Sequence, residues 1–528
     1  MTDEAVTGAP ALAKGDRRLA ILLAMAMFVL VVDTSVMNVS IAAVVHDLHT
    51  TVSGVQSAIA LEALVSAAFI LIGSKVGDLI GRKRAYVLGL LGYAIGALAM
   101  ALAQGLTAVI VFWAIVGGIG ASLLLPAMQS LIHGNFEGAA QRKAYALVGA
   151  AAAIAAAVGP LLGGFITTYL SWRIAFLLED LIIVVVLANI RMVHDVPYTG
   201  SRQVDVVGAI LSILGMGGIV LSILVWQEGG EAVGALFAVG AVSLGSLAWW
   251  LVRRKRAGKA VLLDPDLFKH KLFRFGVSGQ VLQQIGLGGV MIALPIYLQI
   301  VLEYSAMGAG LSIAPLSLSM FAVALIAGRR GGKRRPASLI RAGFALFTVG
   351  MIVIEPIVPR ATSGWYLVVP LLIAGSGLGL MVSQLNNLTL APISEERVSE
   401  AAGVNSAGGS FGLAFAGAIL LAALSLSFTS LAQSSTVLTP AEQQQVAKTL
   451  EHDAQVVSNT QLEEQLAGQP QKTQDEIIRI NTEARHLALQ IALLVPILAG
   501  LAGLGISFRM MRLPDPEQSG SGEQMVLG

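Results

Sequence analysis

Hydrophobic residues run through this chain in fourteen long stretches that are separated by short polar turns. A bilayer core of roughly 30 Å is crossed by about 20 apolar residues in a helix, because backbone groups in lipid must hydrogen-bond within their own segment. The pattern therefore predicts an all-α membrane protein with fourteen transmembrane helices, at about 18–40, 54–73, 86–104, 107–132, 143–168, 174–190, 206–226, 233–252, 275–302, 307–327, 338–356, 365–390, 403–428 and 487–508.

Composition supports a membrane protein. The chain is 55% hydrophobic and 12% charged, and its mean hydropathy is +0.77, whereas a soluble domain carries about 25% charged residues. The net charge of +2 arises mostly from basic loop residues, and no basic stripe with aromatic residues appears, so we expect no nucleic-acid partner. The absence of cysteine excludes disulfides and Cys-ligated metals, and we expect neither a metal site nor a cofactor.

The distribution of basic residues predicts the orientation in the membrane. With the N-terminus inside, 28 of the 34 lysines and arginines lie on the inner side and six on the outer side, as the positive-inside rule requires. The first stretch is too long for a cleaved signal peptide and too polar at Asp33, so it is expected to remain as a helix. We expect a multi-pass protein of the cell membrane with both termini in the cytoplasm and an outer loop at 429–486.

A glycine-containing basic loop follows the second stretch and reads Asp78-Leu79-Ile80-Gly81-Arg82-Lys83-Arg84. Gly81 permits a tight turn, and Asp78 and Arg82 can form charge-assisted hydrogen bonds that latch helix ends in one conformation. A generic basic inner loop is the alternative interpretation.

The fifth stretch contains Gly159-Pro160-Leu161-Leu162-Gly163-Gly164. Proline removes a backbone donor and bends a helix, and glycines four residues apart let a second backbone approach closely.

These motifs, together with 33–39 in the first stretch and 172–176 before the sixth, resemble the fourteen-spanner drug:proton antiporter family of the major facilitator superfamily. The resemblance implies a major facilitator fold of two six-helix bundles with two inserted helices. Gly408-Gly409-Ser410-Phe411-Gly412 stands in the second half where the Gly-Pro motif stands in the first, as internal repeats would place it. The expected units are 1–191, 192–274 with a cytoplasmic linker, 275–508 including the outer loop 429–486, and a cytoplasmic tail at 509–528.

Residues in the second and fourth spans depart from the family pattern. Ala114 and Gly117 replace an arginine and a glutamine that relatives usually carry in the fourth span, and Glu62 replaces a tyrosine in the second. An ionisable group in a membrane costs about 2.5–3.5 kcal/mol and usually faces a cavity. We therefore predict that Asp33 and Glu62 couple transport to protons, as one titrating pair. The alternatives are that Asp33 only hydrogen-bonds to polar neighbours and that Glu62 is a buried structural acid.

Two further acids, Glu179 and Asp180, are also predicted to serve proton coupling or substrate binding. Their expected place near the outer end of the sixth helix leaves a solvated, interfacial role open.

Uncharged polar side chains offer further contacts for a substrate. Gln280 and Gln284 share one helical face, and the predicted cavity also includes Asn38, Gln299 and Asn387. Hydrogen bonding between helices is the alternative role.

The outer loop 429–486 is the one sizeable non-membrane element. Thr439-Pro440-Ala441-Glu442 is typical of a capping box and predicts a helix to about residue 454, and a second helix is expected from Thr473 into the last span. A solvated hairpin is one interpretation, and a gate or partner platform is the other.

The predicted function is export of small lipophilic, cationic compounds by proton antiport, with a monomer as the working unit and contacts to membrane lipids. A lipid or metabolite exporter on the same fold is the alternative, followed by a non-transporting receptor or lipid-handling protein. A pump driven by ATP is excluded because no Gly-x-x-x-x-Gly-Lys-Ser/Thr motif is present. The seven histidines are scattered and form no hydrolase or metalloprotease motif, so the protein is not expected to be an enzyme.

Overall fold

The computed structural model describes residues 14–136, 138–195, 205–227, 232–329, 335–361, 363–393, 397–444, 446, 462–464 and 466–514. Within these ranges every regular element is a helix, as predicted for an all-α membrane protein.

The first seven predicted spans form helices that follow the predicted stretches closely. They are α1 (Lys14–Asp47), α2 (Val52–Ile80), α3 (Arg82–Leu102), the continuous run of α4 (Leu106–Ala108), the π-helix η1 (Val109–Gly117) and α5 (Gly118–Asn135), then α6 (Gly138–Tyr169), α7 (Trp172–Ala188) with the 3-10 turn η2 (Ile190–Met192), and α8 (Val206–Gln227).

The remaining helices complete the second half of the chain. They are α9 (Val233–Arg256), the 3-10 helix η3 (Pro265–Lys269), α10 (Lys271–Ile296) with the π-helix η4 (Tyr297–Val301), α11 (Ala306–Arg329), α12 (Pro336–Ile357) with η5 (Val358–Arg360), η6 (Gly364–Leu367) leading into α13 (Val368–Leu390), α14 (Val398–Gln433) and α17 (Gln471–Met511).

Most of these helices are long and apolar enough to cross a bilayer. Twelve described helices meet this condition, and α6 adds a thirteenth that bends by 46° between Leu147–Ala156 and Val158–Tyr169. The α7 helix has 17 residues, slightly fewer than the roughly 20 of a full span. Each of the fourteen predicted stretches coincides with a helical run, so the arrangement is compatible with fourteen spans.

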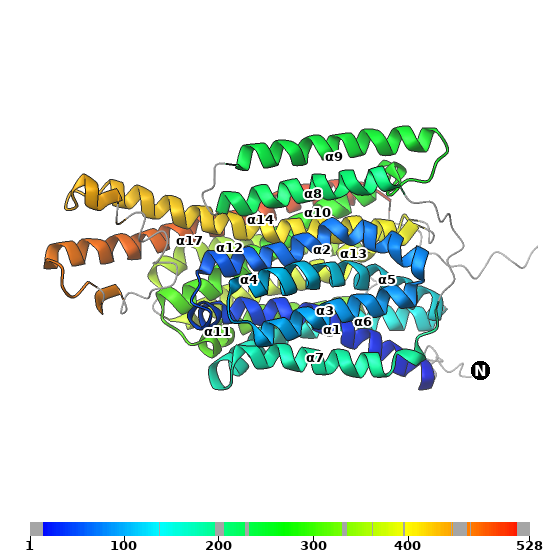
Figure 1. Cartoon of the computed structure of the whole chain (residues 1–528), viewed down its shortest axis with the longest axis horizontal. Helices are drawn as coiled ribbons and strands as arrows, with labels where there is room; N and C mark the ends of the chain where they lie inside the picture. The colour runs from blue at the N-terminus through cyan, green and yellow to red at the C-terminus, as the bar shows by residue number, and fades with distance from the viewer. Residues whose placement is uncertain are drawn as a thin grey trace, which may run out of the picture.

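The helices lie side by side along the long axis of the molecule (Figure 1). We call one end, on the right in Figure 1, the basic end, because the turn from α2 to α3 and the arginine-rich end of α9 lie there. At the opposite end α14 and α17 extend beyond the other helices, and we call this the hairpin end.

The described helices pack in two main groups, with α8 and α9 beside them. In the first part α1 packs on α6 and α3 on α5, and in the second part α10 packs on α14 and α11 on α13, each around its own apolar core. Contacts of α2 with α14 and of α6 with α11 join the two parts, while α8 and α9 pack together and α8 also contacts α2 and α14. The exact unit boundaries stay a prediction, and residues 515–528 of the expected tail lie outside the described residues.

Glycines at the helix crossings account for the close packing. A Cβ on Gly163 of α6 would lie 2.9 Å from Val36 Cα on α1, and one on Gly412 of α14 would lie 2.5 Å from the Val281 carbonyl oxygen on α10. These two crossings join spans 5 and 1 and spans 13 and 9, which hold equivalent positions in the two halves. The contacts therefore agree with the internal repeat predicted from the glycine motifs.

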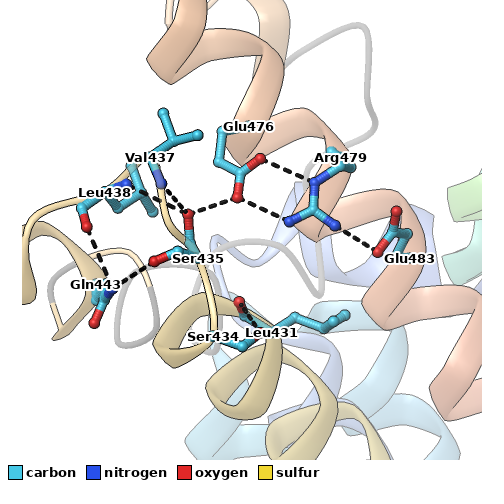
Figure 2. Close-up of polar contacts among 9 residues, drawn as sticks. All are labelled: Leu431, Ser434, Ser435, Val437, Leu438, Gln443, Glu476, Arg479 and Glu483. Atoms are coloured by element: carbon cyan, nitrogen blue, oxygen red, sulfur yellow. Dashed lines mark hydrogen bonds and ion pairs between the residues drawn. The ribbon is translucent and has the colours of Figure 1, made fainter.

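The hairpin end contains a small folded unit built on α14 and α17 (Figure 2). Ser435 Oγ donates a hydrogen bond of 2.5 Å to Glu476 on α17 and accepts bonds from the amides of Val437 and Leu438. Arg479 binds both oxygens of Glu476, at 2.8 and 2.9 Å, and this bond together with that of Ser435 holds the pKa of Glu476 below its usual range against the effect of burial.

The helices predicted in this unit agree with the structure where it is described. Thr439 and Glu442 form the expected capping box, in which the Thr439 amide donates to Glu442 at 2.8 Å and the Glu442 amide donates to Thr439 at 3.4 Å. The second predicted helix is the first part of α17, which continues unbroken into the last span. Residues 447–454 of the first helix lie outside the described residues.

Candidate functional site

Asp33 lies at the centre of the first bundle, on α1, and only 1% of its surface is exposed. Its Oδ2 atom accepts hydrogen bonds from the Tyr93 hydroxyl on α3 and from Trp113 Nε1 on η1, the latter at 3.0 Å. Its Oδ1 atom has no hydrogen-bond partner in the described structure. Two donors from two other helices therefore stabilise the charged form of this aspartate, which is costly to bury otherwise.

Two glutamates from neighbouring helices share the environment of Asp33. Glu62 on α2 and Glu179 on α7 each interact electrostatically with Asp33, and both also act on Tyr93. No lysine, arginine or histidine among the described residues forms a hydrogen bond or ion pair with Asp33. The structure thus brings the predicted pair Asp33 and Glu62 together and adds Glu179 to it, and we call these three residues the acidic cluster.

The position of Glu179 differs from the sequence prediction. It lies near the middle of α7, not at an outer end, and only 2% of its surface is exposed, so a solvated interfacial role is wrong for this residue. Neither carboxylate oxygen of Glu179 has a hydrogen-bond partner within the described residues, and the same holds for the adjacent, partly buried Asp180. An unpartnered buried carboxyl favours its neutral, proton-bound form.

Small residues in the fourth span let the neighbouring helices pack closely around the acidic cluster. This span has Ala114 where an arginine was expected from the resemblance. A Cβ on Gly118 would lie 2.9 Å from the Glu62 carbonyl oxygen, and one on Gly120 would lie 2.7 Å from the Tyr93 amide nitrogen. The bare glycine surfaces let α2 and α3 approach the fourth span closely enough to surround Asp33. Ala114 is fully buried, and the donor that reaches Asp33 from this span is the adjacent Trp113.

Sequence reasoning missed both hydrogen-bond donors of Asp33. Tyr93 and Trp113 carry polar atoms in the middle of apolar stretches, which was an available signal, because buried tyrosine and tryptophan usually find a partner. The fourth span also adopts a π-helix at Val109–Gly117, and such segments frequently occur at functional sites.

At the basic end, the turn that was predicted to act as a latch contacts Asp195, which the sequence did not reveal. Gly81 adopts a φ of +102° between α2 and α3, a conformation that favours glycine. The Lys83 amide donates to Asp195 Oδ1 at 3.0 Å, and Asp195 follows η2 in the chain. Arg82 begins α3 next to this contact, whereas the side chain of Asp78 lies outside the described part of the structure.

The Gly-Pro motif of the fifth span bends α6 and joins it to two helices. The ring of Pro160 conflicts with the carbonyl four residues before it, at Ala156, where the 46° bend begins. Gly159 packs on Ser35 of α1, and a Cβ on Gly164 would lie 2.7 Å from the Ala306 carbonyl oxygen on α11. The motif therefore lies both within the first bundle and at its contact with the second.

The predicted polar cavity residues do not form one group. Gln280 and Gln284 approach Gly409 at the crossing of α10 and α14, which favours a packing role, and Gln299 donates to the Pro295 carbonyl of its own helix at 3.3 Å. Asn38 is buried on α1 with its Oδ1 unpartnered in the described structure. The side chain of Asn387 lies outside the described residues.

A family model places this architecture among known transporters. Residues 23–417 match the model of the Major Facilitator Superfamily. By structure, the chain is similar to the POT family transporter PepTSo, with a TM-score of 0.62, 11% identity and coverage of 96% of this chain and 100% of the other. At that identity the likeness concerns the fold alone.

Curated relatives extend over most of the chain. The puromycin resistance protein pur8 of Streptomyces alboniger is 31% identical over 74% of this chain and 78% of its own length. The probable actinorhodin transporter of Streptomyces coelicolor is 27% identical over 71% of this chain and 66% of its own length, slightly less than two thirds. The multidrug export protein EmrB of Escherichia coli is 26% identical over 73% of this chain and 76% of its own length.

Proposed function

Because the chain belongs to the Major Facilitator Superfamily, we propose that it is a secondary exporter that moves lipophilic, cationic compounds out of the cell in exchange for protons. The relatives named for drug export or resistance support this substrate class. The excess of basic residues on one side of the predicted topology supports an orientation with both termini in the cytoplasm. In this orientation the basic end faces the cytoplasm and the hairpin end faces outward.

The observation that carries the proposal is the acidic cluster. Asp33 and Glu179 are buried, Glu62 beside them is partly buried, and the described residues supply no basic side chain to neutralise Asp33. Three adjacent negative charges cannot coexist in a poorly solvated site, so protons or a cationic substrate must supply the missing positive charge. Exchange between these two kinds of cation is antiport.

The hydrogen bonds suggest separate tasks for the three acids. Asp33, which holds two donors, is proposed to remain charged and to attract the cationic substrate. Glu179, with no partner on either oxygen in the described structure, is proposed to carry a proton together with Glu62. This assignment refines the sequence-based prediction, in which Asp33 and Glu62 together formed the proton-coupling pair.

Inverted membrane vesicles provide the test. Addition of a lipophilic cationic dye should release protons from the protein. When a pH gradient is imposed across the vesicle membrane, this gradient should drive uptake of the dye. Asp33→Asn should abolish cationic dye transport while expression and membrane insertion stay normal. Transport of the dye without linked proton movement would contradict antiport, and full transport by Asp33→Asn would contradict the role of Asp33.

The same vesicles separate the alternative substrates. A panel that includes a neutral dye and a labelled phospholipid distinguishes a cation exporter from a lipid exporter. Binding without any transport, in vesicles that sustain a pH gradient, would indicate a non-transporting receptor.

A further inference from the structure

Four consecutive basic residues, Arg253-Arg254-Lys255-Arg256, end α9. Successive residues of a helix point in directions about 100° apart, so a run of four cannot face one partner. The structure divides the run into two pairs with different surroundings.

The inner pair is engaged by acidic residues of the protein. Arg254 lies 3.7 Å from Asp205, and Lys255 forms ion pairs with Asp264 and Asp266. The bonds from Lys255 and Lys269 hold the pKa of Asp266 at about 2. These acids are therefore already paired with cations of the protein.

The outer pair has no such partner. Arg253 and Arg256 are exposed, and within the described part of the chain neither forms an ion pair. The guanidinium of Arg253 lies 5.1 Å from the centre of the Trp249 ring, and 60% of the Trp249 surface is exposed. This stacked pair presents both a positive charge and an aromatic ring to the surroundings.

More basic residues lie nearby because the linker folds against both helices. Leu251 of α9, Leu267 of the linker and Phe273 of α10 belong to one buried cluster, so the end of α9 and the start of α10 form a single corner. We call it the α9–α10 corner. Its exposed lysines and arginines are Lys269, which pairs with Asp266, and Arg253, Arg256, Lys259, Lys271 and Arg274, for which the described structure shows no ion pair.

The corner ends a helix that is long and apolar enough to span a membrane, which is where lipid headgroups are expected. Large apolar residues before the basic run are exposed on α9, among them Phe237 at 57% and Val242 at 68%, as expected for a helix that faces acyl chains. Tryptophan and arginine at the end of such a helix are typical of the membrane–water interface.

We propose that the α9–α10 corner binds the headgroup of an anionic phospholipid. The phosphate would lie between Arg253 and Arg256, with the Trp249 ring beside the glycerol backbone and the acyl chains along the exposed face of α9. Asp264 of the linker forms ion pairs with Lys255 of α9 and with Arg397, which precedes α14. A lipid bound at the end of α9 would therefore also stabilise the contact between the linker and the second bundle.

Binding is measured by native mass spectrometry and thermal unfolding of the full chain in neutral detergent, with dioleoylphosphatidylglycerol and dioleoylphosphatidylcholine as probes. Each basic residue near an anionic membrane surface contributes about 1 kcal/mol, or about fivefold in affinity. Arg253→Gln with Arg256→Gln should therefore weaken phosphatidylglycerol binding about 25-fold and remove its stabilising shift, without changing the unfolding temperature in the absence of lipid.

Arg509→Gln with Arg512→Gln is the matched control. These arginines have the same spacing and are exposed at the end of α17, so their loss tests for a general charge effect. Equal loss of binding in both double variants would overturn a site at the α9–α10 corner, as would equal binding of phosphatidylcholine by the wild type. Glycerol phosphate that stabilises the protein as strongly as phosphatidylglycerol would identify a site for free phosphate and overturn the lipid proposal.

Discussion

Tyr93→Phe tests whether the charged form of Asp33 is needed for binding a cation. The substitution removes one hydroxyl from a side chain that is 3% exposed and leaves the ring in place, so packing in the first bundle should persist. It deletes one of the two donors to Asp33 Oδ2 and keeps the other, from Trp113.

The magnitude follows from the lost hydrogen bond. A bond to a charged group contributes about 1.5–3 kcal/mol, which corresponds to roughly 10- to 150-fold in an equilibrium constant. Because a cationic substrate must meet a charged Asp33, its affinity should fall by a factor in this range. A neutral lipophilic substrate does not need that charge, so its affinity should change by less than about threefold.

Tyr86→Phe is the matched control. Tyr86 lies on α3 two turns before Tyr93, is fully buried, and has no hydrogen-bond partner for its hydroxyl in the described structure. Its loss should leave the affinity for both substrates unchanged.

The assay is equilibrium binding of one cationic and one neutral dye to purified wild type, Tyr93→Phe and Tyr86→Phe, with thermal unfolding as the check on folding. Unchanged cation affinity in Tyr93→Phe would refute the role of the hydrogen bond. An equal loss for the neutral dye would show that the hydroxyl shapes the cavity and does not act through Asp33.

Three other predictions concern the acidic cluster, the latch and the hairpin end. Glu62→Gln should alter the pH profile of efflux and reduce the efflux of cationic dyes more than that of neutral dyes. An unchanged pH profile would show that Glu62 has only a structural role. Asp195→Asn removes the charge that faces the Lys83 amide and should slow turnover more than it weakens substrate binding, as stopped-flow transport and equilibrium binding would reveal. Glu476→Gln should destabilise the hairpin end by about 1–2 kcal/mol at pH 7, measured by hydrogen exchange. Since the bond to Arg479 lowers the pKa of Glu476 in the folded state, its contribution is present above the unfolded pKa of about 4.3 and is lost as pH falls through the folded value. Wild type and variant should therefore converge as the pH falls below the folded pKa of Glu476, and a constant difference would contradict this reasoning.

The sequence by itself determined the helices and the fold class. The need to satisfy backbone groups within each segment is local, so each of the fourteen apolar stretches coincides with a helical run, and the motif around Pro160 predicted both a bend and a close helix crossing. The capping box at Thr439 was predictable for the same reason, because its bonds join residues three positions apart.

Only the tertiary structure decided which side chains share a site. The bonds from Tyr93 and Trp113 to Asp33 join residues 60 and 80 positions apart, and they depend on how far each helix rotates and on which glycines let helices approach. The same applies to the burial of Glu179 in the middle of α7 and to the contact of Asp195 with the turn from α2 to α3. In the basic run of α9, the sequence shows four similar cations, and only the folded structure determines that Arg254 and Lys255 bind acids of the protein while Arg253 and Arg256 face outward.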